Sequence, residues 1–236
     1  MSLAGTRKTP TFATNEHPRT MMTPSFAGRL YALPLSIALL AAIPCTAQVT
    51  MADILQKKAP LTCVGMDFSE AHFTPRFEFE KLEKRGSVFL NEWNNLIEAE
   101  PAKYDLGKPL GLDYVGNVTS YVLSSNGNFQ PAKAFQAATG PLSDKDIAGI
   151  VSKYPTKGVA GAGVVFFVNS FNKTAEQAQF TMVFFDMGTR RVLHTERLQG
   201  KPGGFGLQNF WAGALVNVLK QIETTYAPAW RVRFAQ

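Results

Sequence analysis

The sequence predicts an α+β fold, an α/β sandwich in which two to three helices pack on a mainly antiparallel sheet that includes a three-strand meander. Two segments rich in Val and Phe, residues 158–171 and 178–188, flank a short polar loop. Such a pair is typical of neighbouring antiparallel strands. A segment near the C-terminus carries apolar residues at helical spacing, which predicts a helix that covers the sheet.

The first 47 residues predict a secretory signal peptide. Arg29 precedes an apolar run at residues 30–44, and small residues follow as far as Ala47. A basic flank, a short apolar core and a small-residue exit are the features of such a peptide. We expect cleavage after Ala47, which leaves residues 48–236 as a single α/β sandwich domain. A retained membrane anchor and a lipoprotein acylated at Cys45 remain alternatives.

The charge of the remaining part is modest. Residues 48–236 keep 20 of the 24 Lys and Arg residues and 17 of the 18 Asp and Glu residues, a net charge of +3. They contain no clustered basic stripe, so we expect no nucleic-acid partner. We also expect no transmembrane helix after cleavage. Cys63 is then the single cysteine, which excludes an internal disulfide and favours a small core residue.

The mature part opens with a predicted strand at residues 59–73. Simple alternation would place Cys63 and Asp67 on one side and Val64 and Met66 on the other. A helix is expected to follow at residues 87–100, because its apolar residues recur at spacings of three and four.

Local capping signals mark where two of the expected helices begin and end. Ser87 is the expected N-cap of the first, and Pro101 closes it. Ser143 is the expected N-cap of a second helix, whose first turn is acidic and which ends before Pro155. Between the two, residues 105–140 give weaker signals that predict a strand followed by a loop.

The C-terminal part continues the meander with a third strand at residues 190–198 and closes with a helix. The residues at its apolar positions are expected to dock on the sheet. They are Trp211, Ala214, Leu215, Val218, Leu219 and Ile222.

The glycine-rich segment before this helix is a candidate ligand-binding loop. Gly204, Gly206 and Asn209 occupy the positions of a dinucleotide fingerprint, with Asn209 where the third glycine would stand. No further parallel strand can follow so close to the end of the chain, which weakens a nucleotide interpretation. We therefore expect the glycines to shape a turn, and an anion at the helix start remains possible.

Two histidine–acid pairs are the candidate metal ligands. Glu70 and His72 would point the same way along one strand, and His194 lies beside Glu196 on another. If the two strands were neighbours, Glu70, His72 and His194 could bind a metal or perform acid–base chemistry. The sequence has no nucleophile motif of the GxSxG type.

Three stretches carry a resemblance to known proteins: "LSDKDIAGIVSKYPTKGVAGAGVVFFVNSFNK", "FFDMGTRRVL" and "FWAGALVNVLK". They look like a group of uncharacterised exported bacterial proteins. The layout of residues 59–223 is similar to the periplasmic α/β sandwich of the curli-secretion lipoprotein and to the N-terminal domain of the Tol-system translocation protein. In this chain "DMGT" reverses the glycine and threonine of their hairpin turn, and their acylated cysteine is not matched. The resemblance implies an interaction role in the envelope and carries over no catalytic residue.

We therefore expect an exported bacterial envelope protein, periplasmic or secreted, that acts as a non-enzymatic binding or assembly module. Its expected partner is another envelope protein, and no cofactor is expected. Association with the outer membrane is left open. One alternative is a periplasmic small-ligand binding protein, and a second is a metal-dependent hydrolase that uses His72 and His194.

Overall fold

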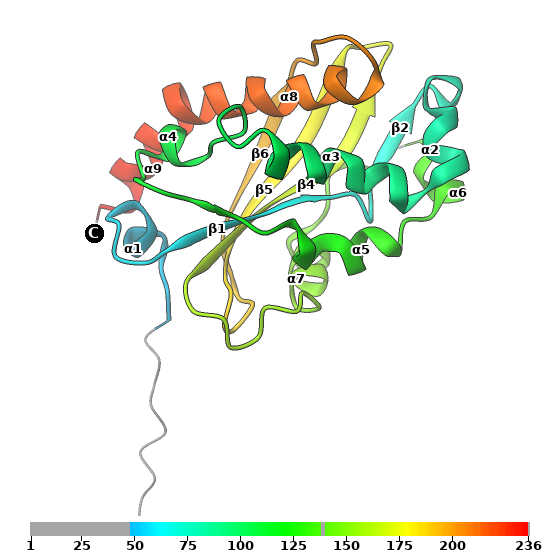
Figure 1. Cartoon of the computed structure of the whole chain (residues 1–236). Coiled ribbons are helices and arrows are strands. Elements are labelled where there is room, and N and C mark those ends of the chain that lie inside the picture. Colours follow the sequence, from blue (N-terminus) through cyan, green and yellow to red (C-terminus); the bar gives the residue numbers. More distant parts are fainter. Residues whose placement is uncertain (1–47, 138–139, 236) are drawn as a thin grey trace, which may run out of the picture. The chain divides into compact units, whose positions relative to one another are not determined.

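The computed structural model describes residues 48–137 and 140–235, which contain a mixed sheet of six strands. The strand order is β3-β1-β4-β5-β6, and β2 pairs with β4 beyond the end of β1 (Figure 1). The strands are β1 (Leu61–Asp67), β2 (His72–Thr74), β3 (Gly116–Asn117), β4 (Ala162–Asn172), β5 (Gln177–Asp186) and β6 (Val192–Gly200). The predicted α+β class is confirmed.

The prediction of a mainly antiparallel sheet is wrong. β1 pairs in parallel with both β3 and β4, and β2 also pairs in parallel with β4. The predicted meander is confirmed, because β4, β5 and β6 pair antiparallel in sequence order. The difference lies in the connections: helices with the short strand β3 among them join β2 to β4, and such long crossovers let a strand return in the same direction.

Gly65 interrupts the alternation of β1. The register with β4 shifts between Cys63 and Gly65, and Gly65 has a φ of +96°. Beyond this bulge Met66 packs with Cys63 in the larger core, whereas the carboxylate of Asp67 accepts a hydrogen bond on the opposite face of the sheet. The prediction that Cys63 and Asp67 share a face is therefore wrong.

Helices cover both faces of the sheet. On one face lie α3 (Ser87–Ala99) and α8 (Leu207–Gln221), and on the other lies α7 (Asp144–Val151) (Figure 1). Trp93 of α3 donates its indole N–H to the carbonyl of Gln208 in α8 at 3.0 Å, which joins the two covering helices.

The capping predictions have mixed outcomes. The predicted Ser143 cap is confirmed, since its hydroxyl accepts from the Asp146 N–H at 3.2 Å. Ser87 is the first residue of α3 rather than its cap, and Gly86 occupies the cap position with a φ of +53°. This glycine lets the chain turn sharply from α2 (Glu80–Arg85) into α3.

The docking face predicted for the last helix is confirmed. All six of its apolar residues are buried: Trp211, Ala214, Leu215, Val218, Leu219 and Ile222. The Trp211 ring stacks on Phe171 of β4, with ring centroids 4.4 Å apart and planes at 1°. The helix continues through a π-helical turn, η3 (Ile222–Tyr226), into α9 (Ala227–Arg233).

The strand predicted within residues 105–140 is mostly wrong. β3 is two residues long, and short helices follow it. The edge of β1 is already occupied beyond this point, because the side-chain amides of Asn94 and Asn126 both donate to the carbonyl of Met66. A longer strand would have no free backbone groups to pair with. The remaining helices are α1 (Met51–Leu55), η1 (Arg76–Phe79), α4 (Gly107–Leu110), η2 (Thr119–Val122), α5 (Leu123–Gly127) and α6 (Pro131–Ala134).

The sheet separates two apolar cores, a larger one beneath α3 and α8 and a smaller one beneath α7. Cys63 lies in the larger core with 3% of its surface exposed, which confirms its predicted place. Burial raises the pKa of its thiol to about 11.

Residues 1–47, on which the predicted signal peptide and the Cys45 alternative depend, lie outside the described residues. Within residues 48–137 and 140–235, no helix has both the length and the apolar character needed to cross a bilayer.

Candidate functional site

The glycine loop, residues 201–206, connects β6 to α8 and is shaped by close backbone contacts. Gly204 has a φ of +127°, and Gly203 donates its N–H to the carbonyl of Phe210 at 2.9 Å. A Cβ placed on Gly213 would lie 2.0 Å from the Gly203 carbonyl oxygen. A side chain at Gly204 or Gly213 would push the loop away from α8, so the prediction that the glycines shape a turn is confirmed.

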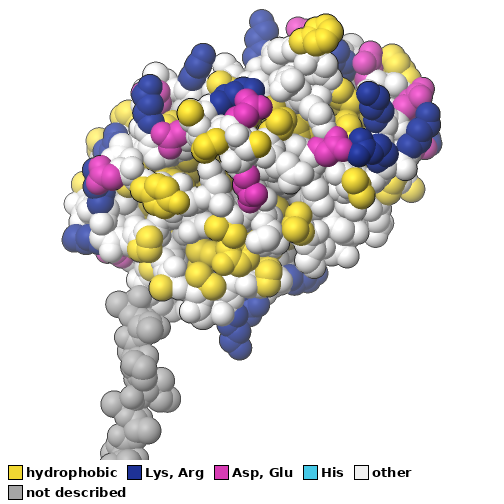
Figure 2. Space-filling view, in the orientation of Figure 1, with side chains coloured by type: hydrophobic (Ala, Val, Ile, Leu, Met, Phe, Trp, Pro, Cys, Tyr) yellow, Lys and Arg dark blue, Asp and Glu magenta, His cyan; other side chains and the backbone are white. Residues whose placement is uncertain are grey.

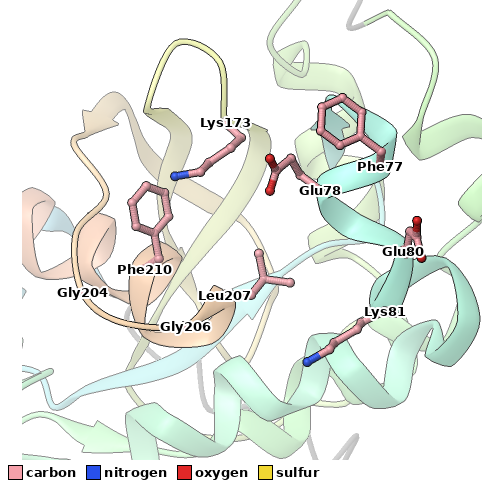
Figure 3. A pocket seen from close by; sticks show the side chains of 9 residues that line it. All are labelled: Phe77, Glu78, Glu80, Lys81, Lys173, Gly204, Gly206, Leu207 and Phe210. Atoms are coloured by element: carbon pink, nitrogen blue, oxygen red, sulfur yellow. The ribbon is translucent and has the colours of Figure 1, made fainter.

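This loop forms one wall of a cavity of about 590 Å³, which we call the glycine-loop groove (Figure 3). The second wall is η1 with the start of α2, and the turn between β4 and β5 adds Lys173. The lining residues are Phe77, Glu78, Glu80, Lys81, Lys173, Gly204, Gly206, Leu207 and Phe210. Two of the three predicted ligand-binding residues, Gly204 and Gly206, therefore line it.

The third, Asn209, lines a smaller neighbouring cavity of about 200 Å³. This cavity shares Lys81, Gly206 and Leu207 with the glycine-loop groove, and Phe205 also lines it. The two cavities therefore adjoin along the same side of the loop.

Aromatic contacts hold both walls in place. The Phe79 ring of η1 is fully buried and stacks on Trp211 of α8, with centroids 5.7 Å apart. Because Phe79 faces the core, Phe77, two residues earlier in the same short helix, faces solvent with 71% of its surface exposed. Phe205 at the tip of the glycine loop is 96% exposed.

The charges of the groove balance one another. Glu78 points into the groove from η1, whereas Lys173 extends away from it and places its ammonium 3.6 Å from the centre of the Phe210 ring (Figure 3). Glu80 forms an ion pair with Lys84 at 3.4 Å. With two acids and two lysines in its lining, the groove has no net charge of its own.

Sequence reasoning missed Phe77 and Phe205. The signal for Phe205 is present in the sequence: a large aromatic residue sits alone in a glycine-rich loop, where no apolar neighbours could bury it. No comparable signal identifies Phe77, because "RFEFE" does not show which of its two rings faces the core.

The structure does not bring the predicted metal ligands together. His72 lies on β2 and His194 on β6, and β4 and β5 separate these strands in the sheet. The convergence needed for a site built from Glu70, His72 and His194 therefore does not form. The described residues hold no group of three or more His, Cys, Asp or Glu side chains that could bind a metal ion.

Each predicted ligand has a local partner instead. Glu70 forms an ion pair with Lys133, and Nδ1 of His72 lies 3.2 Å from the carbonyl of Gln136. His194 is 9% exposed, and its Nε2 lies 3.5 Å from a carboxylate oxygen of Glu196. Burial lowers the pKa of His194, although the nearby Glu196 carboxylate acts in the opposite direction.

Comparisons with known proteins give little support for an assignment. No protein-family model matches the sequence, and no curated protein matches it. Among solved structures, the chain is similar to the LpoB C-terminal domain from Salmonella enterica, with 9% sequence identity and a TM-score of 0.24. The match covers 64% of this chain and 94% of that chain. At such a score the likeness carries no conclusion about fold or function.

Proposed function

We propose that this protein is an exported bacterial envelope protein that acts as a non-enzymatic binding module and docks a partner protein at the glycine-loop groove. One observation carries the docking proposal: Phe77 and Phe205 expose 71% and 96% of their surfaces on the two sides of this groove. Export rests on the predicted signal peptide.

Exposed aromatic rings that flank a cavity indicate a contact surface. Burying one phenylalanine side chain contributes about 1.5–3 kcal/mol, so two such rings offer a partner a large gain from apolar contact. Aromatic residues also dominate the residues that contribute most to protein–protein affinity. Both rings stand on backbone that is held in place. The Phe79 ring holds η1 against the core, and the close approach of Gly213 to Gly203 holds the glycine loop against α8.

The partner chemistry follows from the balanced charge. With no excess of acid or base in the lining, the groove favours an apolar segment of a partner protein over a strongly charged metabolite. The face in Figure 2 likewise shows Lys and Arg side chains interspersed with Asp and Glu. Apolar contact is therefore the main source of affinity that this surface offers.

A small ligand is the alternative occupant. The volume of about 590 Å³ falls within the range of roughly 300–1,000 Å³ that is usual for ligand pockets. Such pockets bury about 70–90% of their ligand, however, and most of the groove lining is exposed, including Phe77, Glu78 and Lys81. The open lining favours a protein segment.

Site-specific photo-crosslinking in the producing cells tests the proposal. A photoreactive amino acid replaces Phe205, and a matched control replaces Val232, which is 81% exposed on α9. We expect a discrete protein adduct from position 205 and none of that size from position 232. Adding Phe77→Ser should reduce the adduct, because Phe77 lines the other side of the groove.

Two outcomes would overturn the docking proposal. Equal adducts from positions 205 and 232 would mean that Phe205 contacts proteins only by chance. A metabolite that raises the melting temperature of the purified protein, and whose effect is lost in Phe77→Ser, would identify the groove as a small-ligand site.

A further inference from the structure

A second surface, distinct from the glycine-loop groove, is the free edge of the sheet at β6. The Gln199 carbonyl faces α8, where it accepts a hydrogen bond from the side-chain N–H of Gln221 at 2.8 Å. The Gln199 backbone therefore points away from β5. Since backbone direction alternates along an antiparallel strand, Thr195 and Arg197 point outward with it.

Apart from the Gln199 carbonyl, these outward backbone groups have no hydrogen-bond partner within the described residues. Neither Thr195 nor Arg197 forms a backbone hydrogen bond beyond the β5–β6 ladder there, and neither does the N–H of Gln199. A row of unpaired N–H and C=O groups at a sheet edge is a template for an added strand. Arg197 and Gln199 are exposed and Thr195 is half-buried, so this row is accessible.

On the opposite side of the sheet, side chains close the part of β1 that extends beyond the two-residue strand β3. At β1, the Asn94 side chain accepts from the Met66 N–H at 2.7 Å and donates to the Met66 carbonyl at 2.9 Å. The Asn126 side chain accepts from the Phe68 N–H at 2.7 Å. Two side-chain amides thus take the place of a neighbouring strand.

The side chains around the β6 edge are basic. Arg191, Arg197 and Lys201 are exposed, and none of them forms an ion pair within the described part of the chain. The one acid of β6, Glu196, accepts a hydrogen bond from the Trp230 indole at 3.1 Å on the helix-covered face. An incoming acidic segment would therefore meet positive charge without repulsion.

We propose that the β6 edge binds an extended, acidic segment of a partner protein as an added strand. Main-chain hydrogen bonds to Thr195, to Arg197 and to the N–H of Gln199 supply the affinity, and the basic side chains select the acidic sequence. Pairing with a second copy of this chain is disfavoured, because an antiparallel pair centred on the outward-facing residue Arg197 places this arginine opposite its own copy.

The probe is a fluorescent nine-residue peptide of alternating Glu and Val, matched in length to β6 and titrated against the purified protein. Two matched peptides accompany it, one with Lys in place of Glu and one with N-methylated backbone amides. We expect the Glu peptide to bind and both matched peptides to bind about tenfold more weakly or worse, since each lacks the charge or the hydrogen bonds.

Two variants at position 197 separate the contribution of the side-chain charge to peptide binding from that of the backbone hydrogen bond. Arg197→Ala removes the charge and should weaken binding a few-fold, whereas Arg197→Pro also removes the outward N–H and should weaken it further. Phe77→Ser should leave binding of the Glu peptide unchanged. No binding of the Glu peptide at millimolar concentration, or binding that tolerates N-methylation, would overturn the proposal. A protein dimer seen by sedimentation and lost in Arg197→Pro would show instead that a second copy takes this edge.

Discussion

Truncating Trp211 tests the packing that holds both walls of the glycine-loop groove. The ring is 1% exposed, stacks on Phe171 at 4.4 Å and contacts Phe79 at 5.7 Å and Phe210 at 5.3 Å between ring centroids. Replacing a buried tryptophan with alanine typically costs about 3–5 kcal/mol, and lost aromatic pairs add about 0.5–1.5 kcal/mol each.

One feature of the site reduces this cost. The indole N–H of Trp211 is buried and has no hydrogen-bond partner within the described residues. Leaving such a group unpaired costs about 1–3 kcal/mol, which both alanine and phenylalanine at this position would recover. We therefore expect Trp211→Ala to lower the free energy of unfolding by about 3–5 kcal/mol in total, and Trp211→Phe to change it by about 1 kcal/mol or less.

Urea unfolding followed by circular dichroism measures both values, because the signal does not depend on the tryptophan that is removed. Val232→Ala serves as the control, since Val232 is 81% exposed and should leave stability unchanged. The dependence of the free energy on urea should stay the same in all variants. If Trp211→Ala unfolds within about 1 kcal/mol of the wild type, the packing of α8 on the sheet is not what stabilises this fold.

Three further predictions address other parts of the structure. Gly213→Ala should lower the unfolding free energy by about 1–3 kcal/mol in the same assay, because its methyl group would overlap the Gly203 carbonyl; unchanged stability would contradict the close contact. Cys63 should react with a thiol reagent at neutral pH only after unfolding, since burial raises its pKa to about 11; rapid labelling of the folded protein would contradict its burial. His194 has a pKa below its unfolded value of 6.5, so the unfolded state binds the proton more readily, and stability should be complete above pH 6.5 and fall as the pH drops below it. His194→Gln should flatten that fall, and an equal fall in both proteins would assign it to other groups.

The sequence was most informative where one pattern has one structural meaning. The six apolar residues of the last helix, five in α8 and Ile222 in η3, repeat at helical spacing and are all buried. The Ser143 cap and the β4–β5–β6 meander follow from equally local signals. In each case the residues that determine the element lie within that element or its nearest neighbour. Tertiary contacts then agree with the local preference.

Prediction from the sequence failed where a contact between residues far apart in the chain determines the structure. The direction of β1 depends on a long crossover, and its alternation depends on the bulge at Gly65, where a Cβ would lie 2.4 Å from the Asn94 side chain. The β-rich residues after Asp105 form little strand because Asn94 and Asn126 occupy the edge of β1. Asn94 occupies a polar position of α3, and its local sequence does not indicate that its side chain pairs with the backbone of β1 in place of a neighbouring strand.

The candidate site was predicted only in part, because it too depends on contacts between distant segments. The glycines that line the groove are visible in the sequence, but their second wall comes from η1, more than a hundred residues earlier in the chain. The predicted convergence of His72 and His194 was wrong. An acid two residues from each histidine and a strand pattern do not reveal that β2 and β6 lie on opposite sides of β4 and β5.

The affinity of the partner that crosslinks at position 205 tests the docking function most directly. Titrated against that purified partner, Phe205→Ser should bind about tenfold more weakly than the wild type or worse, because the lost apolar contact corresponds to about 1.5–3 kcal/mol. Val232→Ser, which alters an equally exposed apolar residue outside the groove, should bind like the wild type. Equal dissociation constants for the wild type and Phe205→Ser would contradict the assignment of the glycine-loop groove as the docking surface.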